Sequence, residues 1–200
     1  MNSYTKKLKL WESAALIALS AALCAGAWAQ GRQNSIRANL VRLHVVAVSD
    51  DDYEQALKLR VRDAVLAYLS PVLEEAEAAE DAKALIGDHL EEVAQAARSA
   101  SEGREVTVSL GCERFPTRQY EGFTLPAGEY DSLRIILGEG QGHNWWCIVF
   151  PPVCVSAVQA DRLREVMNPE DLKIITEDEG YELKFKIVEL WGELKNHLTA

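Results

Sequence analysis

The stretch that decides the fold reads Asn144-Trp145-Trp146-Cys147-Ile148-Val149-Phe150-Pro151-Pro152-Val153-Cys154. Residues 145–150 are rich in aromatic and β-branched types, which favour a strand, and the two prolines that follow favour a reversal of the chain. Adjacent residues of a strand face opposite sides of a sheet, so Trp145 and Trp146 cannot both enter one core. Two interpretations stay open: one indole is core and the other lies under a closing helix, or one is exposed as an interface anchor.

The pattern around this strand predicts an α+β fold: an antiparallel sheet packed against two N-terminal helices and a closing C-terminal helix, in a single domain spanning residues 30–200. Strands and helices segregate along the chain, which is typical of that class. Strands are expected at 40–48, 105–112, 131–137 and 145–150, and around 183–185. A helix is expected from a capping-box-like start at Asp51 and Glu54 to about Val72, with Pro71 kinking or ending it. Further helices are expected at 80–100, 160–166 and 187–198. The sequence also indicates a polar linker at 30–37, a glycine turn at 138–142 and an acidic loop at 168–180.

The N-terminus has the three parts of a secretory signal. Lys6, Lys7 and Lys9 are followed by an apolar run and then by Ala27-Trp28-Ala29, which has small residues at the two positions that a signal peptidase reads. We expect residues 1–29 to be removed, with Gln30 as the new N-terminus. The alternative is a membrane anchor retained over residues 10–29. Both predict a folded domain outside the cytoplasm.

The charge of the chain excludes some partners. The first 29 residues hold three Lys and one Glu, so their removal changes the formal net charge from −10 to −12. A domain this acidic lacks the Lys/Arg clusters that phosphate contacts need, and we expect no nucleic-acid partner.

Cleavage would leave three cysteines, Cys112, Cys147 and Cys154. An oxidising compartment favours one pair. Cys147 and Cys154 lie seven residues apart around the Pro151-Pro152 reversal, so we predict a disulfide between them. Cys112 follows the alternation of Val106, Val108 and Leu110, which predicts a buried strand position.

The residues suggest no assembled active site, cofactor, metal or small-molecule substrate. The glycines at 138–142 lack the helix and the Lys-Ser/Thr of a phosphate loop, so we interpret them as a hairpin turn. The four histidines, His44, His89, His143 and His197, have no metal-ligand spacing. A pairing of Cys147 with His143 would make a thiol nucleophile. In a strand, however, these positions lie about 13 Å apart at ~3.3 Å per residue.

Several segments resemble the stage II sporulation protein R family of endospore-forming bacteria. The resemblance covers nearly the whole mature chain. It rests most specifically on residues 133–154, because the Asn-Trp-Trp-Cys run with Phe-Pro-Pro and a second Cys is rare. The supporting segments are VRLHVVAVSD (41–50), QALKLRVRDAV (55–65), FPTR (115–118) with Tyr120, LPAGEY (125–130) and KFKIVEL (184–190). One departure is Val48, where the family pattern has Asn.

The resemblance implies a signalling protein that is not an enzyme. A member of this family is exported from the forespore into the space between the forespore and mother-cell membranes. There it activates a membrane-embedded sporulation aspartic protease from its extracytoplasmic face. That protease processes the precursor of the mother-cell sigma-E factor. The alternative function, from another class, is a secreted cell-wall or peptide hydrolase that uses Cys147.

We predict that the partner-binding surface lies around the strand at 145–150. A disulfide would fix the turn that follows, and a pre-ordered loop loses less entropy on binding. The candidate contact residues are His143, Asn144, Trp145, Trp146, Phe150, Pro151 and Pro152, with Pro116 and Arg118 as neighbours. The competing interpretation is that this segment is simply the best-packed part of the core.

Overall fold

The computed structural model describes residues 3–120, 122–151, 163 and 166–176. The chain divides into two units, one formed by residues 1–34 with 180–200 and the other by residues 35–179. The strand expected around 183–185 and the helix expected at 187–198 lie outside the described residues, as do Pro152 and Cys154.

The first unit contains most of α1, which runs from Ser3 to Ala38. Within it, Trp11–Ala38 is long and apolar enough to cross a membrane, and a signal sequence has the same properties. Its large apolar side chains are exposed, among them Trp11, Ile17 and Trp28. The prediction of a polar linker at 30–37 is wrong, because these residues continue α1. Gln33, Arg37 and Ala38 are good helix formers, and Ile36 is fully buried at the helix end.

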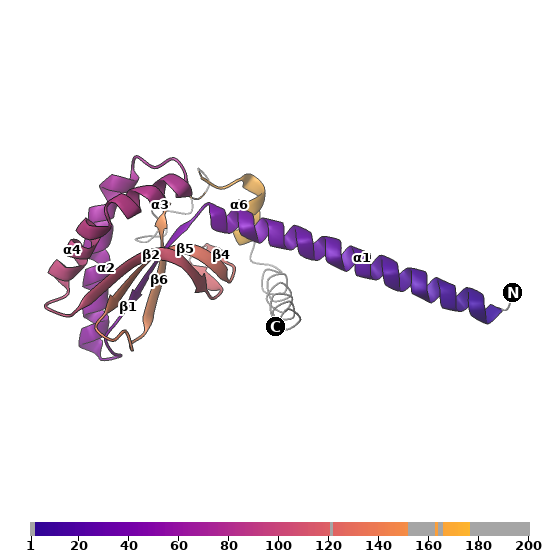
Figure 1. Ribbon diagram of the computed structural model, residues 1–200, viewed down its shortest axis with the longest axis horizontal. Coiled ribbons are helices and arrows are strands. Elements are labelled where there is room, and N and C mark those ends of the chain that lie inside the picture. Colours follow the sequence, from indigo (N-terminus) through magenta and orange to yellow (C-terminus); the bar gives the residue numbers. More distant parts are fainter. Residues whose placement is uncertain (1–2, 121, 152–162, 164–165, 177–200) are drawn as a thin grey trace. The chain divides into compact units, whose positions relative to one another are not determined.

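The second unit is built on a four-stranded sheet with the order β2-β5-β1-β6 (Figure 1). The strands are β1 (Val41–Val46), β2 (Val106–Phe115), β5 (Gly128–Leu137) and β6 (Asn144–Phe150). β2 runs antiparallel to β5, and β6 runs antiparallel to β1. The pair β1–β5 is parallel. The sheet is therefore mixed, whereas a purely antiparallel sheet was expected. A parallel pair needs a long connection, and the 81 residues between these strands include three helices.

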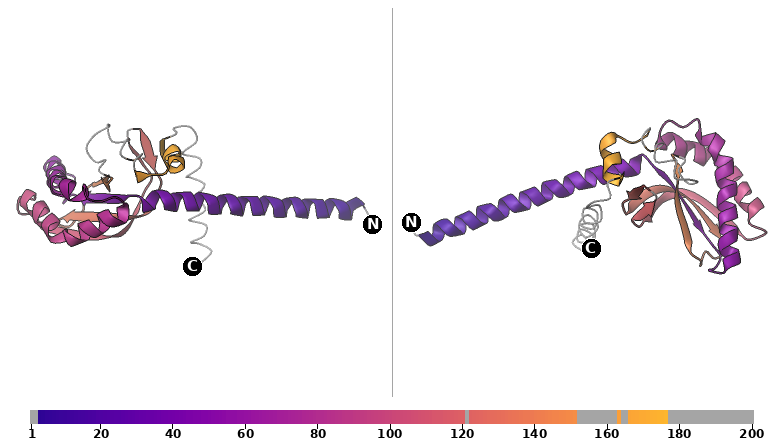
Figure 2. Two further views of the ribbon diagram at one scale, coloured as in Figure 1. Left: turned by 90° about the horizontal axis from the view of Figure 1, so that it is seen from above. Right: turned by 180° about the vertical axis from the view of Figure 1, so that it is seen from behind.

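Three helices cover one face of the sheet: α2 (Asp52–Leu73), α3 (Ala79–Asp88) and α4 (Leu90–Ala100) (Figures 1 and 2). The main core lies between these helices and the sheet, and it includes Leu43, Val61, Leu69 and Ile135, all fully buried. Pro71 lies in the last turn of α2, where it ends the helix two residues later, as expected. The single helix expected at 80–100 is two helices, which meet at His89. Its backbone leaves the helical region there, and its Nδ1 lies 2.7 Å from the hydroxyl of Tyr68.

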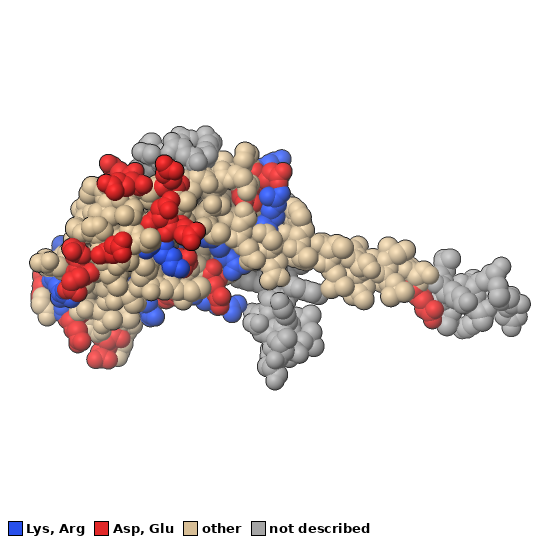
Figure 3. All heavy atoms as spheres, turned by 45° about the horizontal axis from the view of Figure 1, so that its top comes forward, with Lys and Arg blue, Asp and Glu red and all other residues tan. Residues whose placement is uncertain are grey.

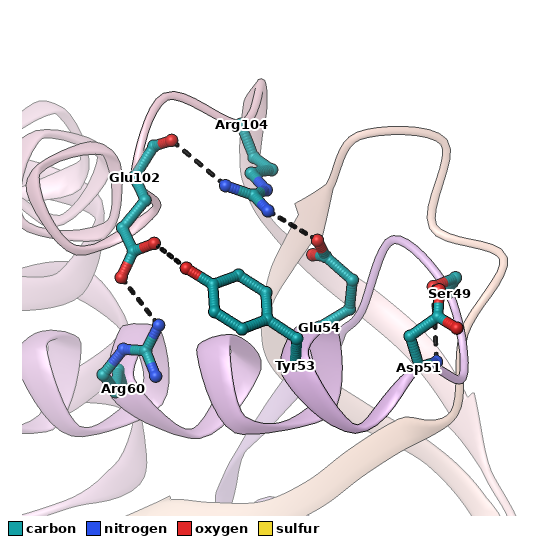
Figure 4. Close-up of polar contacts among 7 residues, drawn as sticks. All are labelled: Ser49, Asp51, Tyr53, Glu54, Arg60, Glu102 and Arg104. Carbon is teal, nitrogen blue, oxygen red and sulfur yellow. Dashed lines mark hydrogen bonds and ion pairs between the residues drawn. The ribbon is translucent and has the colours of Figure 1, made fainter.

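A polar network joins the start of α2 to the turn after α4 (Figure 4). Arg104 Nη2 lies 2.6 Å from Glu54 Oε1, and Arg60 Nη2 lies 2.7 Å from Glu102 Oε1. Tyr53 donates its hydroxyl to Glu102, between the two guanidinium groups. The network fixes the helix layer at the end of the sheet where β1 leads into α2.

The opposite face of the sheet carries a second, smaller core. It lies under a separate two-stranded sheet, β3 (Arg118–Tyr120) with β4 (Phe123–Leu125), and under α6 (Pro169–Thr176). Its buried residues are Ile36, Leu40, Phe115, Phe123, Leu125, Tyr130, Ile148, Leu163, Met167 and Ile175. The prediction of an acidic loop at 168–180 is wrong for Pro169–Thr176, because these residues form α6. The side chain of Asn168 caps this helix by accepting from the Asp171 N–H at 2.8 Å, and Pro169 occupies the first helical position. The α+β class itself is confirmed.

Two cores explain why β1 is buried along its whole length, since both of its faces are covered. Acidic side chains outnumber basic ones on the face of this unit seen in Figure 3. Of the helix expected at 160–166, residues 163 and 166 are described, and both are helical.

Candidate functional site

Trp145 and Trp146 lie on opposite faces of β6, as predicted. Trp145 packs against the main core, where the Arg62 guanidinium carbon lies 4.4 Å from its ring centroid. Trp146 packs against the second core. Both side chains are half-buried, and neither indole N–H has a hydrogen-bond partner within the described residues. Each indole therefore combines a packed face with an edge near the surface.

Trp146 is held by rings from β1 and from the last residue of β2. It lies opposite His44 of β1 in the sheet register, and the two rings are stacked with centroids 3.7 Å apart. Phe115 of β2 meets the indole edge to face at 4.7 Å. Arg118, an exposed residue of β3, places its guanidinium carbon 5.8 Å from the indole centroid. These contacts fix the orientation of Trp146 before any partner binds.

Both ring nitrogens of His44 lie within hydrogen-bond distance of oxygen atoms in the buried layer beneath Trp146. Its Nδ1 lies 2.8 Å from Glu113 Oε1, and its Nε2 lies 2.7 Å from Asn144 Oδ1. Ser132 donates to the other oxygen of Glu113 at 3.3 Å. The serine thus contacts the carboxylate and not the imidazole, so this group is not a nucleophile with its base. It positions Asn144 and Trp146.

Arg42 is the residue that the sequence reasoning missed. It is the largest fully buried side chain of the described residues, and it lies on the same sheet face as His44. Its Nε donates to the carbonyl oxygen of Cys147 at 3.1 Å, and its Nη2 donates to the hydroxyl of Tyr120 at 2.6 Å. Its Nη1 has no partner among the described residues. Burial lowers the pKa of Arg42, because an apolar environment disfavours the charged form.

Three aromatic rings surround this guanidinium. Its carbon lies 4.3 Å from the ring centroid of Phe115, 5.0 Å from that of Tyr130 and 5.8 Å from that of Tyr120. Burial raises the pKa of Tyr120, so its hydroxyl stays protonated and donates to the carbonyl oxygen of Trp146 at 3.4 Å. The available signal for this site was an arginine inside a predicted strand that is otherwise rich in Val and Leu.

The remaining predicted contact residues fall into two groups. His143 is exposed, and its Nδ1 lies 2.5 Å from Asp50 Oδ1. Pro116 and Arg118 are also exposed, at the two ends of the connection between β2 and β3. Phe150 and Pro151 are buried, so they offer no surface to a partner. We call Asn144, Trp146, Pro116 and Arg118 the Trp146 surface.

The glycine segment before β6 is a turn with positive φ angles at Gly138 and Gly140. The prediction of a hairpin is wrong, because β1 lies between β5 and β6 in the sheet. The backbone N–H of Gly142 donates to the carbonyl oxygen of Ala47 at 2.9 Å. A Cβ at Gly142 would lie 2.2 Å from the carbonyl oxygen of Ser49, so this position requires glycine. The turn thus holds the start of β6 against the end of β1.

The comparisons with known proteins agree on one family. The family model described as Stage II sporulation protein R matches residues 37–160. The chain is also 31% identical over 180 residues to the stage II sporulation protein R of Bacillus subtilis (strain 168), an alignment that covers 77% of this chain and 80% of the relative. This chain belongs to the stage II sporulation protein R family. No solved structure gives a significant match.

The family match spans β1 to β6 and therefore the whole of the Trp146 surface. The membership makes this a sporulation protein. The apolar α1 is compatible with export, as a signal peptide or as an anchor.

The cysteines of this family member lie in different environments. Cys147 is 3% exposed and faces the helix layer with the main core. The free thiols among the described residues are Cys24 and Cys112. The prediction that Cys112 is buried is wrong. It lies on the edge strand β2 opposite Asp131, whose carboxylate binds Lys83, so the apolar layer does not extend to it. The disulfide between Cys147 and Cys154 stays a prediction.

Proposed function

We propose that this chain is an exported signalling protein of sporulation that activates a membrane-embedded aspartic protease, leading to processing of the sigma-E precursor. The place of action is the space between the forespore and mother-cell membranes. The observation that carries the proposal is the family membership, together with an apolar α1 that is compatible with export.

The Trp146 surface supports a binding role. It presents an aromatic edge and an arginine on two strands, and a proline in the connection between β2 and β3. Trp and Arg are among the residues that most often dominate binding energy. Rigid contact residues lose little entropy on binding. This surface would contact the extracytoplasmic side of the protease.

Activation requires a difference in affinity. A ligand shifts a protein between inactive and active arrangements only by as much as it binds one better than the other. About 100-fold activation needs about 2.7 kcal/mol of such a difference, which is an ordinary coupling energy. A few contacts on the Trp146 surface can supply it.

The alternative, a hydrolase that uses Cys147, gains no support from the site. Cys147 is buried on the helix-covered face, whereas His44 lies on the opposite face. His143 is engaged with Asp50. Within the described residues, no group of three or more His, Cys, Asp or Glu is placed to hold a metal ion.

The deciding experiment co-expresses this chain with the protease and the sigma precursor, and follows the shortening of the precursor. The expected result is shortening that requires all three proteins. An Arg118→Ala variant should reduce it, while Arg60→Ala, at an exposed arginine of α2, should not. Precursor that stays full-length with export and folding intact would refute the proposal.

A further inference from the structure

Two N–H donors on one face of the sheet have no acceptor within the described residues. They are Nη1 of Arg42 and Nε1 of Trp146. Both belong to the layer between the sheet and the β3–β4 pair, and the ring of Phe115 lies beside both of them. A buried donor that has lost water without gaining an acceptor costs about 1–3 kcal/mol, and more when it is charged. The fold therefore keeps two such donors on residues that contact one and the same ring.

The guanidinium of Arg42 also has no carboxylate partner in the described part of the chain. Two neutral oxygens and three aromatic rings offset only part of the cost of burying its charge. On this face, the strands carry one carboxylate, that of Glu113, which is already bonded to His44 and Ser132. An arginine presents its N–H groups as a fork that matches the two oxygens of a carboxylate.

We infer that Arg42, assisted by Trp146, is the receptor for a carboxylate group of a protein partner. One carboxylate oxygen accepts from Nη1 of Arg42, and the indole N–H of Trp146 is the second donor. The inference rests on the proposed function only for the identity of the partner. The ligand chemistry itself follows from the two donors.

Tyr120 controls access to this receptor. It comes from β3, which belongs to a separate sheet with no backbone pairing to β1 or β6. Its hydroxyl accepts from Arg42 and donates to the Trp146 carbonyl, and its side chain is half-buried. A carboxylate can replace that hydroxyl on the guanidinium without breaking the main sheet. Arg118, exposed beside Trp146, adds positive charge on the approach.

The test titrates three peptides into the full-length protein with nitrogen-15 in its arginines, and follows the Nε–H resonance of Arg42. A tetraglutamate peptide blocked at both ends supplies side-chain carboxylates. A tetraglutamine peptide with a free C-terminus supplies only a terminal carboxylate, and the fully blocked tetraglutamine supplies none. We expect at least one carboxylate peptide to shift the resonance, and the blocked tetraglutamine to leave it in place. If the tetraglutamate peptide shifts the resonance, the receptor binds a side-chain carboxylate. If the tetraglutamine peptide with a free C-terminus shifts it, the receptor binds a terminal carboxylate.

Variants separate recognition from folding. Arg42→Met removes a buried charge whose desolvation opposes folding, and it also removes two hydrogen bonds, so the melting temperature should change little. It should also weaken binding of the active peptide at least about tenfold, which is ~1.4 kcal/mol. Arg60→Met is the matched control, because Arg60 is exposed and already paired with Glu102. It should bind as the unmodified chain does.

The inference is overturned if no carboxylate peptide shifts the Arg42 resonance more than the blocked tetraglutamine does. It is also overturned if Arg42→Met binds the peptides as tightly as the unmodified chain. The resonance is measured on the unmodified chain, so a variant that unfolds leaves the test decisive. The peptide titration needs no protease. Successful peptide binding without protease activation would therefore refute the proposed function and still support the carboxylate receptor.

Discussion

The imidazole of His44 lies nearly parallel to the indole of Trp146, with ring centroids 3.7 Å apart and 14° between the planes. The two residues face each other across β1 and β6. An aromatic pair of this kind contributes about 0.5–1.5 kcal/mol beyond the area it buries. Because Glu113 and Asn144 hold the imidazole on both sides, the indole rests on a ring that cannot turn.

The first prediction compares the two tryptophans. Trp146→Phe keeps a ring for His44 to stack on but removes the indole N–H and its outer edge. We expect it to lower protease activation about tenfold, or ~1.4 kcal/mol of binding. Trp145→Phe, the matched control on the helix-covered face, should leave activation unchanged. Thermal unfolding should show a loss of less than about 1.5 kcal/mol for each variant.

Two outcomes would contradict this prediction. Equal activation by Trp146→Phe and the unmodified chain would place the contact elsewhere. A loss confined to Trp145→Phe would move it to the other face of the sheet.

The second prediction concerns the cysteines. In the native protein, iodoacetamide should modify Cys112, which is exposed, and should not modify Cys147. Peptide mapping without reduction should find Cys147 linked to Cys154. A disulfide that closes a loop of about eight residues contributes roughly 2–3 kcal/mol, so Cys147→Ser should lower the free energy of unfolding by that amount. Cys112→Ser should not change it. A linked Cys112 would refute the assignment.

The third prediction is a pH dependence at Asp50. Hydrogen bonds from the side chain and the backbone N–H of His143 lower the pKa of Asp50 below its ordinary value of 3.8. A carboxyl whose pKa is lower in the folded state stabilises the fold above the unfolded pKa, and this contribution is lost as the pH falls through the folded value. Asp50→Asn should therefore lower the melting temperature at pH 6, and the difference should shrink at a pH below the folded pKa of Asp50. A difference that is the same at both pH values would show that charge is not its cause.

Much of the fold follows from short-range patterns in the sequence. The strand at β6 and the glycine turn before it are local features, and the alternation of faces places Trp145 and Trp146 without any tertiary information. The parallel pairing of β1 with β5 could not be predicted in this way, because it depends on how the helices between them return the chain.

The errors have the same origin. Cys112 continues an apolar alternation, but the covering layer ends before it, and nothing in the strand itself marks that limit. Arg42 is the opposite case, a residue that is buried although its charge predicts exposure. A charged residue predicts exposure, yet a central strand with two covered faces leaves it no route to water. The candidate contact surface was predicted from its tryptophans, whereas the burial of the Arg42 guanidinium depends on tertiary packing.

The last prediction concerns the end of α1, which belongs to the folded domain. Ile36 is fully buried in the second core, and Ser35 donates its hydroxyl to Asp171 Oδ2 at 2.5 Å. A chain that starts at Gln30, the expected product of signal cleavage, keeps both contacts and should fold with full stability. A chain that starts at Asn39 loses a buried isoleucine and a hydrogen bond to a carboxylate, which together contribute about 3–5 kcal/mol.

Urea unfolding of the two chains measures this difference. Ile36→Ala in the Gln30 chain is the matched point variant, and it should lose about 2–4 kcal/mol, because it removes the apolar contact and leaves Ser35 in place. N-terminal sequencing of the exported protein then shows whether the natural chain begins at Gln30 or keeps α1 whole. If the Asn39 chain proves as stable as the Gln30 chain, the end of α1 is not part of the core. In that case residues 30–38 would contribute nothing to the stability of the folded domain.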